Sequence, residues 1–458
     1  MQYSIVYFSE AKKDKRFDSE FLNKKVVINK LLTKNQYVNL GSISYITDGE
    51  HGSPEYDENG YICLTGKNVK DFYIDLSNIY QISENQFKKN SRVLVKRGNI
   101  LIGIVGTIGN STLIMEDMNA ITSRHLATIK CKDNYNDFNI SKSYIVTFLN
   151  SKYGKEQSIL FSAGNVQPLI NLTNISKFLI PIFSDEFQKS IEKLVFEAHS
   201  QRQISNSLMK EANEILEKEI GFDKLEIKKK KVNYSIVNYS ETLSSKRIDA
   251  EYYQEKYQII MDKIQSYKNG YDILDNICFI KKGIEPGSEY YRDNGIPFLR
   301  IQNLTKYDLK LDNCIYVDND FYNKNAEYRV DKDDILLSKD GSPGIAYHIY
   351  NLNNLSMITS RGILRLKIKD NTFLPEVLAL ILNSKVVDYQ VKQASGGAVI
   401  LHWRMEEIFN TVIPIIDKNV QNIIAEKVQE FYKARDSAKA LLEEAKKKVE
   451  DAIENGER

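Results

Sequence analysis

The chain has 458 residues, of which 42% are apolar and 27% charged, a composition that fits a soluble globular protein of two or three domains. No apolar run reaches the roughly 18 residues that span a bilayer, and the N-terminus lacks the apolar core of a signal peptide, so we expect a cytoplasmic protein with no membrane partner. The four cysteines form no CxxC pair, which favours reduced thiols and no metal site.

The net charge of +2 does not by itself indicate a nucleic-acid-binding protein. Residues 1–184 carry 22 basic and 17 acidic side chains, a balance of 22 − 17 = +5, whereas residues 235–416 carry 22 and 24, a balance of 22 − 24 = −2. A protein that grips DNA alone neutralises several phosphates with Lys and Arg. If this chain binds DNA, either its basic residues cluster on one face or partners supply most phosphate contacts.

The first half of the chain predicts a mixed α/β domain. Apolar residues cluster as in a strand over 37–46, and the stretch from Gly98 to Gly103 predicts a turn that enters another strand. The glycine-rich run Gly103–Gly109 does not match a GxGxxG phosphate loop and predicts a turn. A helix is expected over 141–152.

A long helix is predicted next, from 185 to 221. It contains no Pro or Gly before Gly221, and its apolar residues recur mostly at steps of three and four. A basic linker, 222–234, follows and includes the run Lys228–Lys231, which we expect to be solvated.

The second half repeats this order of elements. Strands are predicted over 271–280 and 333–338, and a helix over 373–392. A second long helix over 417–458 has an apolar stripe like that of the first. Each long helix would measure about 50 Å at 1.5 Å per residue. Because such narrow stripes need a partner, we expect the two helices to pair with each other.

Short motifs recur in the same order in both halves, at sequence offsets that differ by only a few residues. Arg16–Phe21 (RFDSEF) matches Arg247–Tyr252 (RIDAEY), and Ile43–Gly49 matches Ile277–Gly283. The remaining pairs are Ile100-Leu101 with Ile335-Leu336, Gly106 and Gly109 with Gly341 and Gly344, Ile121–Arg124 with Ile358–Arg361, Leu149–Lys152 with Leu382–Lys385, and Ile180–Ile182 with Ile413–Ile415. The chain is therefore a tandem duplication.

These elements predict an α+β fold. We expect a tandem duplication of an α/β domain, partly β-barrel, with each copy followed by a long helix and the helices paired as an antiparallel coiled coil. The expected boundaries are 1–184 for the first domain, 185–221 for the first helix, 222–234 for the linker, 235–416 for the second domain and 417–458 for the second helix.

Motifs that would indicate catalysis are absent from the sequence. No two prolines are adjacent, so the Asn/Asp-Pro-Pro-aromatic segment of an amino-methyltransferase is missing, and there is no GKS or GKT phosphate loop. The five histidines have no HExxH or other metal-ligand spacing. We therefore expect no catalytic residue and no metal or cofactor bound to this chain.

The duplicated pattern resembles the specificity subunit of Type I restriction–modification systems. In each half a strand ends in glycine (Gly49; Gly283), an Asn-Gly turn follows (Asn59-Gly60; Asn294-Gly295), and then come a short strand with Asn (Asn68; Asn303), the paired glycines and a small loop (162–164; 395–397). One departure is Gly98-Asn99, where the turn usually carries an acidic residue. The resemblance covers nearly the whole chain and rests on order and duplication.

The resemblance implies a non-catalytic, sequence-specific DNA-binding protein. Each domain would be a target-recognition domain that reads one half of a bipartite, asymmetric target in double-stranded DNA. The helices would set the gap between half-sites and dock two adenine-N6 methyltransferase subunits, which use S-adenosylmethionine. A motor–nuclease subunit would join them for cleavage.

Base reading favours forked or bidentate side chains, such as Arg on guanine and Asn or Gln on adenine. In the first domain the candidates are Lys67, Asn68, Thr107, Asn110, Arg124, His125, Asn165 and Gln167. In the second domain they are Arg300, Gln302, Asn303, Lys339, Ser342, Arg361, His402 and Arg404. Because Arg124 and Arg361 are identical in both copies, phosphate contact or support of the fold suits them better than sequence reading.

Two other functions stay open at this point. The chain could be a stand-alone DNA methyltransferase or nuclease with an unrecognised site, which bound S-adenosylmethionine or activity of the chain alone would indicate. It could also be a duplicated scaffold that binds protein or sugar, which a lack of binding to any duplex would indicate.

Overall fold

The computed structural model describes residues 19–132, 140–164, 168–225, 236–312, 314–353, 355–395 and 401–457. The chain forms two compact units, of which unit 1 contains Met1–Gln203 and Arg435–Arg458 and unit 2 contains Ile204–Ala434. Each unit therefore combines one copy of the duplication with a part of each long helix. The sequence boundaries at 184 and 416 follow the duplication, whereas the compact units divide both helices.

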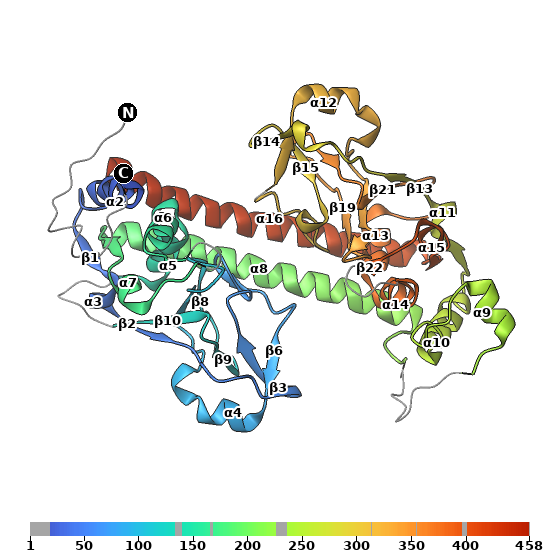
Figure 1. Ribbon diagram of the computed structural model, residues 1–458, viewed down its shortest axis with the longest axis horizontal. Coiled ribbons are helices and arrows are strands. Elements are labelled where there is room, and N and C mark those ends of the chain that lie inside the picture. The colour runs from blue at the N-terminus through green and yellow to red at the C-terminus, as the bar shows by residue number, and fades with distance from the viewer. Residues whose placement is uncertain are drawn as a thin grey trace. The chain divides into compact units, whose positions relative to one another are not determined.

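Unit 1 alternates short strands with short helices (Figure 1). Its helices are α2 (Ser19–Leu32), α3 (Leu40–Ile43), α4 (Glu84–Lys89), α5 (Lys142–Asn150), α6 (Lys152–Leu160) and α7 (Leu172–Ser176). Its strands are β1 (Tyr37–Asn39), β2 (Ser44–Asp48), β3 (Tyr56–Leu64), β4 (Val69–Lys70), β5 (Tyr73–Ile74), β6 (Tyr80–Ile82), β7 (Ile100–Gly103), β8 (Ser111–Leu113), β9 (Ala120–Thr122), β10 (Leu126–Cys131) and β11 (Leu179–Pro181).

Unit 2 repeats this series, and one further helix, α9, precedes it among the described residues. Its helices are α9 (Tyr239–Ser245), α10 (Glu255–Gln265), α11 (Leu274–Ile277), α12 (Asn319–Lys324), α13 (Pro375–Asn383), α14 (Lys385–Ala394) and α15 (Met405–Phe409). Its strands are β12 (Tyr271–Ile273), β13 (Cys278–Lys282), β14 (Tyr291–Arg292), β15 (Ile296–Leu299), β16 (Ile315–Val317), β17 (Ile335–Ser338), β18 (Asp340–Gly341), β19 (Ala346–His348), β20 (Ile358–Thr359), β21 (Ile363–Ile368), β22 (Leu401–His402) and β23 (Val412–Pro414).

The two units share their sheet topology. A four-stranded antiparallel sheet has the order β2-β10-β7-β8 in unit 1 and β13-β21-β17-β19 in unit 2. A second sheet contains a parallel pair, β3 with β9 in unit 1 and β15 with β20 in unit 2. The predicted α+β class is confirmed. Its β part consists, among the described residues, of small open sheets and not of the partly closed barrel that the sequence suggested.

Two predicted elements are interrupted in the structure. The strand expected over 37–46 is divided by α3, because Leu40 and Ile43 both turn into the core at helical spacing. The helix expected over 373–392 ends at Asn383, and Ser384 begins α14, since the Ser384 hydroxyl accepts a hydrogen bond from the Val386 N–H at 3.2 Å.

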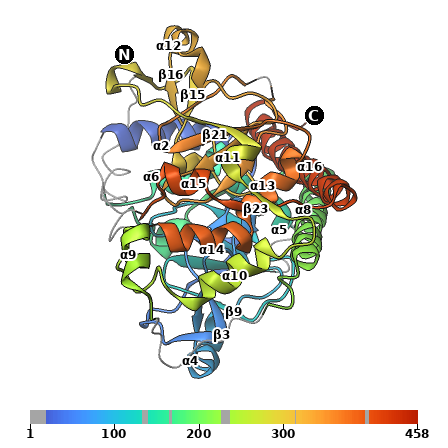
Figure 2. The ribbon, with the colours of Figure 1, turned by 90° about the vertical axis from the view of Figure 1, so that its right-hand side faces the viewer.

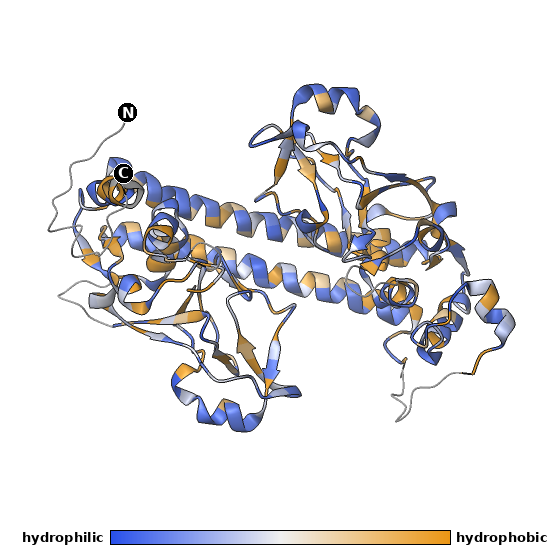
Figure 3. Cartoon of the chain, viewed as in Figure 1, coloured by the Kyte–Doolittle hydropathy of each residue, from blue (hydrophilic) through white to orange (hydrophobic). Residues whose placement is uncertain are grey.

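The two long helices are α8 (Asp185–Ile220) and α16 (Lys418–Asn455). In unit 1, Ile191 and Val195 of α8 share a core with Ala445 and Val449 of α16. In unit 2, the C-terminal half of α8 and the N-terminal half of α16 likewise share a core, and Lys427 pairs with Glu211 at 2.7 Å. Hydrophilic residues predominate along both helices, with apolar residues between them (Figure 3). Within each unit the helix halves are therefore antiparallel partners.

The repeated tetrapeptide Leu-Asn-Ser-Lys joins each domain to the helices of its own unit. Asn150 hydrogen-bonds the backbone of Ser111 in β8, and Asn383 does the same to Ala346 in β19. The serine that follows caps the next helix. Lys152 then pairs with Glu454 of α16, and Lys385 with Glu217 of α8 at 3.0 Å. This shared task accounts for the identity of the motif in both copies.

Helix α10, near the beginning of the second copy, packs against a later helix of the same copy. In Figure 2, α10 lies beside α14, and the rings of Tyr257 and Tyr389 meet edge to face at 6.4 Å.

Among the residues that the structure describes, no helix is both long enough and apolar enough to cross a membrane.

Candidate nucleic-acid interface

Four segments of the chain meet at one place in each copy, and they carry most of the predicted site residues that the structure describes. We name them the edge loop, the glycine turn, the Ser-Arg turn and the return segment. In unit 1 they are residues 65–68, 103–109, 122–125 and 168–170; in unit 2 they are 300–303, 338–344, 359–362 and 401–403.

Backbone hydrogen bonds hold the four segments together in the same way in both units. The Ser-Arg turn donates to the strand before the edge loop, from Ser123 to Leu64 and from Ser360 to Leu299, each at 2.8 Å. Ile104 donates to the carbonyl of His125, and Ile170 donates to that of Ile104, both at 3.0 Å.

The corresponding bonds in unit 2 run from Lys339 to Gly362 at 3.0 Å and from Trp403 to Lys339 at 2.9 Å. The framework of the site is therefore duplicated bond for bond.

A buried asparagine shapes each edge loop. The Asn68 carboxamide accepts from the N–H of Thr65 at 2.9 Å and donates to the carbonyls of Asp75 and Asn78. Asn303 accepts from the N–H of Arg300 at 2.9 Å and donates to Lys310 at 2.8 Å. Both side chains are buried, and their amides form hydrogen bonds within the loop. Asn68 and Asn303 are therefore not proposed to read bases.

Glycines allow the segments to approach one another. A Cβ on Gly49 would lie 2.2 Å from the Ser123 carbonyl oxygen, and one on Gly283 would lie 2.2 Å from that of Ser360. In the glycine turns, Gly106 and Gly341 have φ values of +75° and +67°, a conformation that favours glycine. The paired glycines of the sequence thus form a turn, as predicted.

The unit 2 site presents a cluster of charged and amide side chains. Asp340 accepts hydrogen bonds from Lys339 at 2.5 Å and from the His402 ring at 2.8 Å. Burial raises the pKa of Asp340, but these two hydrogen bonds outweigh burial and keep the pKa below its ordinary value. Asp340 is therefore ionised at neutral pH and can accept further hydrogen bonds.

Arg300 has a buried side-chain donor that lacks a partner among the described residues. Its Nε is buried without a hydrogen-bond partner among the described residues. An orphaned guanidinium nitrogen is costly unless a ligand completes it, which points to a bound acceptor. Gln302, Ser342 and Arg361 are exposed on the neighbouring segments.

The unit 1 site is less charged. The Thr107 hydroxyl donates to the Gly66 carbonyl at 2.7 Å, and the His125 ring lies 3.3 Å from the Ser123 hydroxyl. Burial, followed by the charge of Arg124, lowers the pKa of His125, so the ring is neutral at pH 7. Lys67 and Arg124 are exposed.

Some predicted residues lie apart from this cluster of segments or outside the description. The Asn110 amide oxygen accepts from Lys155 at 2.8 Å. Arg404 pairs with Glu407 at the start of α15. Asn165 and Gln167 fall outside the described residues.

Sequence reasoning missed two residues at the site, Asp340 and Thr65. The candidates chosen from the sequence all carry a hydrogen-bond donor, a choice that passes over Asp340, although a carboxylate can accept from cytosine N4. Thr65 occupies the position of Arg300, since both backbone N–H groups bond the loop asparagine. Aligning the two edge loops on that asparagine would have identified Thr65.

The charged residues of the unit 2 site lie close together, although the net charge of that domain does not indicate a nucleic-acid-binding protein. In unit 2, Arg300, Lys339 and Arg361 come from three of the four joined segments, and these segments contain a single carboxylate, Asp340, which pairs with Lys339. A domain with a balance of −2 can thus present a locally basic site.

A comparison with known protein families matches the half of the chain that contains the unit 2 site. The family model described as Type I restriction modification DNA specificity domain matches residues 272–447. This match confirms the family resemblance in the copy that carries the unit 2 site. No curated protein matches the chain.

Solved structures with similar chains include two of the same kind. The S subunit of a Type I restriction-modification system from M. genitalium is 13% identical, covers 92% of this chain and 96% of its own, and has a TM-score of 0.42. The HsdS subunit from Thermoanaerobacter tengcongensis is 13% identical, covers 92% and 97%, and has a TM-score of 0.29.

Proposed function

We propose that this chain, whose residues 272–447 match a Type I restriction modification DNA specificity domain, is the specificity subunit of a Type I restriction–modification complex. It reads a bipartite, asymmetric DNA target and docks two adenine-N6 methyltransferase subunits and a motor–nuclease subunit, and it performs no catalysis itself. The observation that carries the proposal is a four-segment site that occurs twice, with one backbone framework and two different sets of side chains.

The two copies differ at positions of the framework that are exposed or half-buried. Thr65 of the first edge loop corresponds to Arg300 of the second, Lys67 to Gln302, and His125 of the Ser-Arg turn to Gly362. A shared framework with different donors and acceptors supports two readers of different base sequence. The target is therefore asymmetric.

The chemistry of the unit 2 site favours a mixed half-site. Arg300 supplies the fork that binds guanine O6 and N7, Gln302 supplies the amide that binds adenine N6 and N7, and Asp340 supplies an acceptor for cytosine N4. Arg361 matches Arg124 of the first copy and is exposed, which suits a phosphate contact that both half-sites share.

The long helices suit the task of spacing the half-sites. With 36 and 38 residues, α8 and α16 are each about 55 Å long. Half-sites one turn of DNA apart lie roughly 34–36 Å from centre to centre. Helices of this length can span that gap and still offer surface to the methyltransferase subunits.

A methylation assay with purified components tests the proposal. Three samples receive labelled S-adenosylmethionine and host DNA: the chain alone, a candidate methyltransferase subunit from the same host alone, and both together. We expect label in DNA with both proteins and none with either alone. Methylation by the chain alone would establish the stand-alone enzyme instead.

Duplex binding by the assembled complex distinguishes the proposed function from the remaining alternative, a duplicated scaffold. We expect binding that weakens as salt rises, because phosphate contacts release counterions. A complex that binds no duplex at any salt concentration would contradict the proposal and favour a scaffold for protein or sugar.

A further inference from the structure

An exposed aromatic ring occurs at the same position in both copies and lies outside the four-segment sites. Tyr45 on β2 and Phe279 on β13 are equivalent in the duplication, and they are 65% and 59% exposed. The neighbouring strands, β10 and β21, end in matching sequences, 130–132 (KCK) and 367–369 (KIK). Each copy therefore combines one exposed ring with one Lys-x-Lys sequence.

The first lysine of each sequence lies opposite the ring. In the strand register, Tyr45 pairs with Lys130, and Phe279 pairs with Lys367. Directly opposite residues of an antiparallel pair point to the same face of the sheet. Lys130 is half-buried and Lys367 is exposed. A cation thus stands beside the ring on the same face in both units.

The second lysine of each sequence lies over the ring. The distance from Nζ to the ring centroid is 5.0 Å for Lys132 over Tyr45 and 5.2 Å for Lys369 over Phe279, which suits a cation–π contact. We call each group of three side chains an aromatic–lysine patch. The patches consist of Tyr45, Lys130 and Lys132 in unit 1, and of Phe279, Lys367 and Lys369 in unit 2.

Backbone carbonyls orient the second lysine of each patch. Lys132 Nζ donates to the Ser42 carbonyl in α3 at 2.7 Å, and Lys369 Nζ donates to the Asp275 carbonyl in α11. A carbonyl fixes the direction of an ammonium group without cancelling its charge. Each patch therefore holds a positioned positive charge beside an exposed ring.

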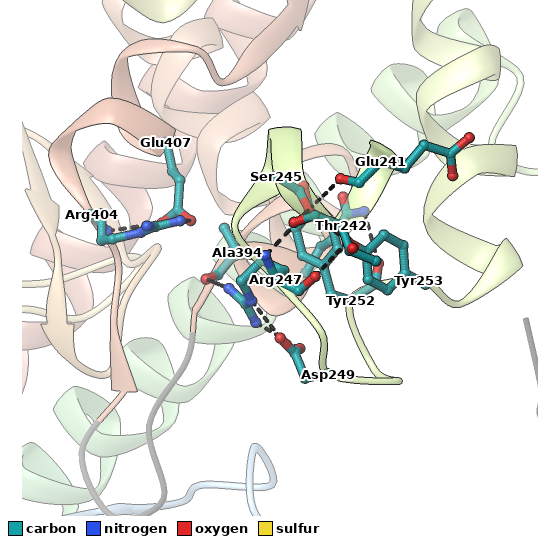
Figure 4. Close-up of polar contacts among 11 residues, drawn as sticks. Glu241, Thr242, Ser245, Arg247, Asp249, Tyr252, Tyr253, Ala394, Arg404 and Glu407 are labelled. Carbon is teal, nitrogen blue, oxygen red and sulfur yellow. Dashed lines mark hydrogen bonds and ion pairs between the residues drawn. The ribbon is translucent and has the colours of Figure 1, made fainter. Parts of the chain in front are cut away.

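Arg247 of unit 2 also lies over a ring, but its charge is neutralised by a carboxylate. Its guanidinium is 4.9 Å from the centroid of the Tyr252 ring and forks onto Asp249, with Nε 2.5 Å from Oδ1 and Nη2 2.8 Å from Oδ2 (Figure 4). The Arg247 side chain is only 16% exposed. Arg247 thus completes its interactions within its own motif, whereas the patch lysines keep their charge at the surface.

Folding alone does not account for the exposed rings. A ring that stays more than half exposed removes little apolar surface from water, so it adds little to hydrophobic stability. Later positions on the same strands differ in charge between the copies, since Thr47 corresponds to Lys281 and Asp48 to Lys282. The aromatic residue is kept where these positions change, which indicates a task at the surface that both copies share.

The patches lie further along the strands that leave the Ser-Arg turns. β10 begins at Leu126 and β21 at Ile363, directly after those turns, and the patch lysines follow these residues by four and six positions. At about 3.3 Å per residue of strand, they stand about 13–20 Å from the start of the strand. A partner bound at a patch would therefore leave the base-reading side chains accessible.

The chemistry of the patches favours a protein partner over DNA. Phe279 has no polar group, so its ring gains only by burial against apolar atoms. Duplex DNA presents phosphates, which attract the lysines but offer nothing to the ring. Protein interfaces bury aromatic side chains at their centre and carry polar groups around them. The lysines call for acidic groups around the apolar contact of the partner.

We propose that the two aromatic–lysine patches are docking sites for the two methyltransferase subunits, each of which presents an apolar contact bordered by acidic side chains. The inference rests on the proposed function, in which the methyltransferase is the partner that is present twice. A patch repeated in both copies fits a partner that binds twice, whereas the base-reading sites differ because the half-sites differ. Part of the docking surface then belongs to the recognition domains and not to the long helices.

Titration of the full chain with the methyltransferase subunit, followed by native mass spectrometry, tests the inference. The wild-type chain should bind two copies. With Phe279→Ala and Lys367→Glu combined, we expect one copy to bind as before and the other at least about tenfold more weakly, because the variant loses a buried aromatic contact and reverses a charge. Tyr45→Ala with Lys130→Glu should act in the same way, and all four changes together should weaken both copies.

Two further variants serve as controls. Tyr239→Ala combined with Lys324→Glu removes an exposed ring and reverses an exposed lysine elsewhere in unit 2, so two copies should bind with wild-type affinity. Phe279→Tyr places the aromatic residue of the first patch in the second, and we expect it to bind like the wild type. The Tm of every variant shows whether the fold is retained.

Three results would overturn the inference. The first is wild-type affinity for two copies in the chains with one altered patch. The second is equal weakening of both copies together with a lower Tm than that of the control, which would assign the patches to folding. The third is duplex binding by the complex that becomes less dependent on salt while two copies stay bound, which would assign the patches to DNA phosphate. A wild-type chain that binds no methyltransferase subunit would instead contradict the proposed function itself.

Discussion

Buried amides maintain the shape of the two edge loops. Asn303→Ala would leave the Arg300 N–H and the Lys310 carbonyl without their partner. We expect the variant to lose about 1–3 kcal/mol of stability, because unsatisfied buried polar groups carry that cost. Urea unfolding measures it. Gln302→Ala, one residue away and exposed, should unfold like the wild type, and equal losses in both variants would contradict this role for Asn303.

Arg361 is expected to contact phosphate and not bases. In the assembled complex, Arg361→Gln should weaken binding to every duplex by a similar factor. The slope of log K against log salt should become shallower by about 0.9, the value for one phosphate contact. Lys268→Gln, at an exposed lysine paired with Glu219, is the control. A loss confined to one DNA sequence would instead make Arg361 a base reader.

His348 gives unit 2 a pH dependence. Burial lowers its pKa from 6.5, and this effect outweighs the nearby charges of Glu376 and Asp333. The unfolded chain then takes up protons below pH 6.5 more readily than the folded chain, so stability is complete above that pH and falls below it. We expect the Tm to drop from pH 7.5 to 5.5, and to drop less in His348→Gln. Identical drops would exclude His348 as the cause.

Among the helices and strands, those whose apolar residues recur at regular spacing could be predicted from the sequence. The long helices were expected at 185–221 and 417–458, and they run Asp185–Ile220 and Lys418–Asn455. The helix break at Ser384 was not, because apolar residues continue at helical spacing through it. The break depends on a hydroxyl cap and on Asn383, whose partner Ala346 is 37 residues away. A contact between distant residues leaves no local pattern.

The helix pair within unit 2 can be tested by creating a cavity. Leu216 of α8 is 1% exposed and shares a core with Val428 and Phe431 of α16. Leu216→Ala should destabilise the chain by about 2–5 kcal/mol. Glu214→Ala removes an exposed partner of Lys210 and should cost under about 0.5 kcal/mol. Chemical unfolding of both variants measures these losses of stability. A small loss of stability for Leu216→Ala would exclude tight packing of Leu216 between α8 and α16.

For the whole molecule, the duplication was the feature that the sequence revealed most clearly. It predicted two similar domains and two long helices, and it pointed to glycines and Ser-Arg turns that the structure joins in each copy. It did not separate framework residues from surface residues. Asn303 and Gln302 are both amides in one loop, and only their burial shows that Asn303 builds the loop and that Gln302 is exposed.

The map of methyladenine in host DNA tests the central claim most directly, that the two copies specify two halves of one target. It is measured by single-molecule sequencing with the methyltransferase alone, with the intact chain, and with a chain in which Arg300→Thr and Gln302→Lys copy positions 65 and 67. With the methyltransferase alone we predict no split motif. With the intact chain we predict a split asymmetric motif, and with the exchanged chain we predict the same motif with one half altered. A motif that is unchanged by the exchange, or present without the chain, would contradict the account.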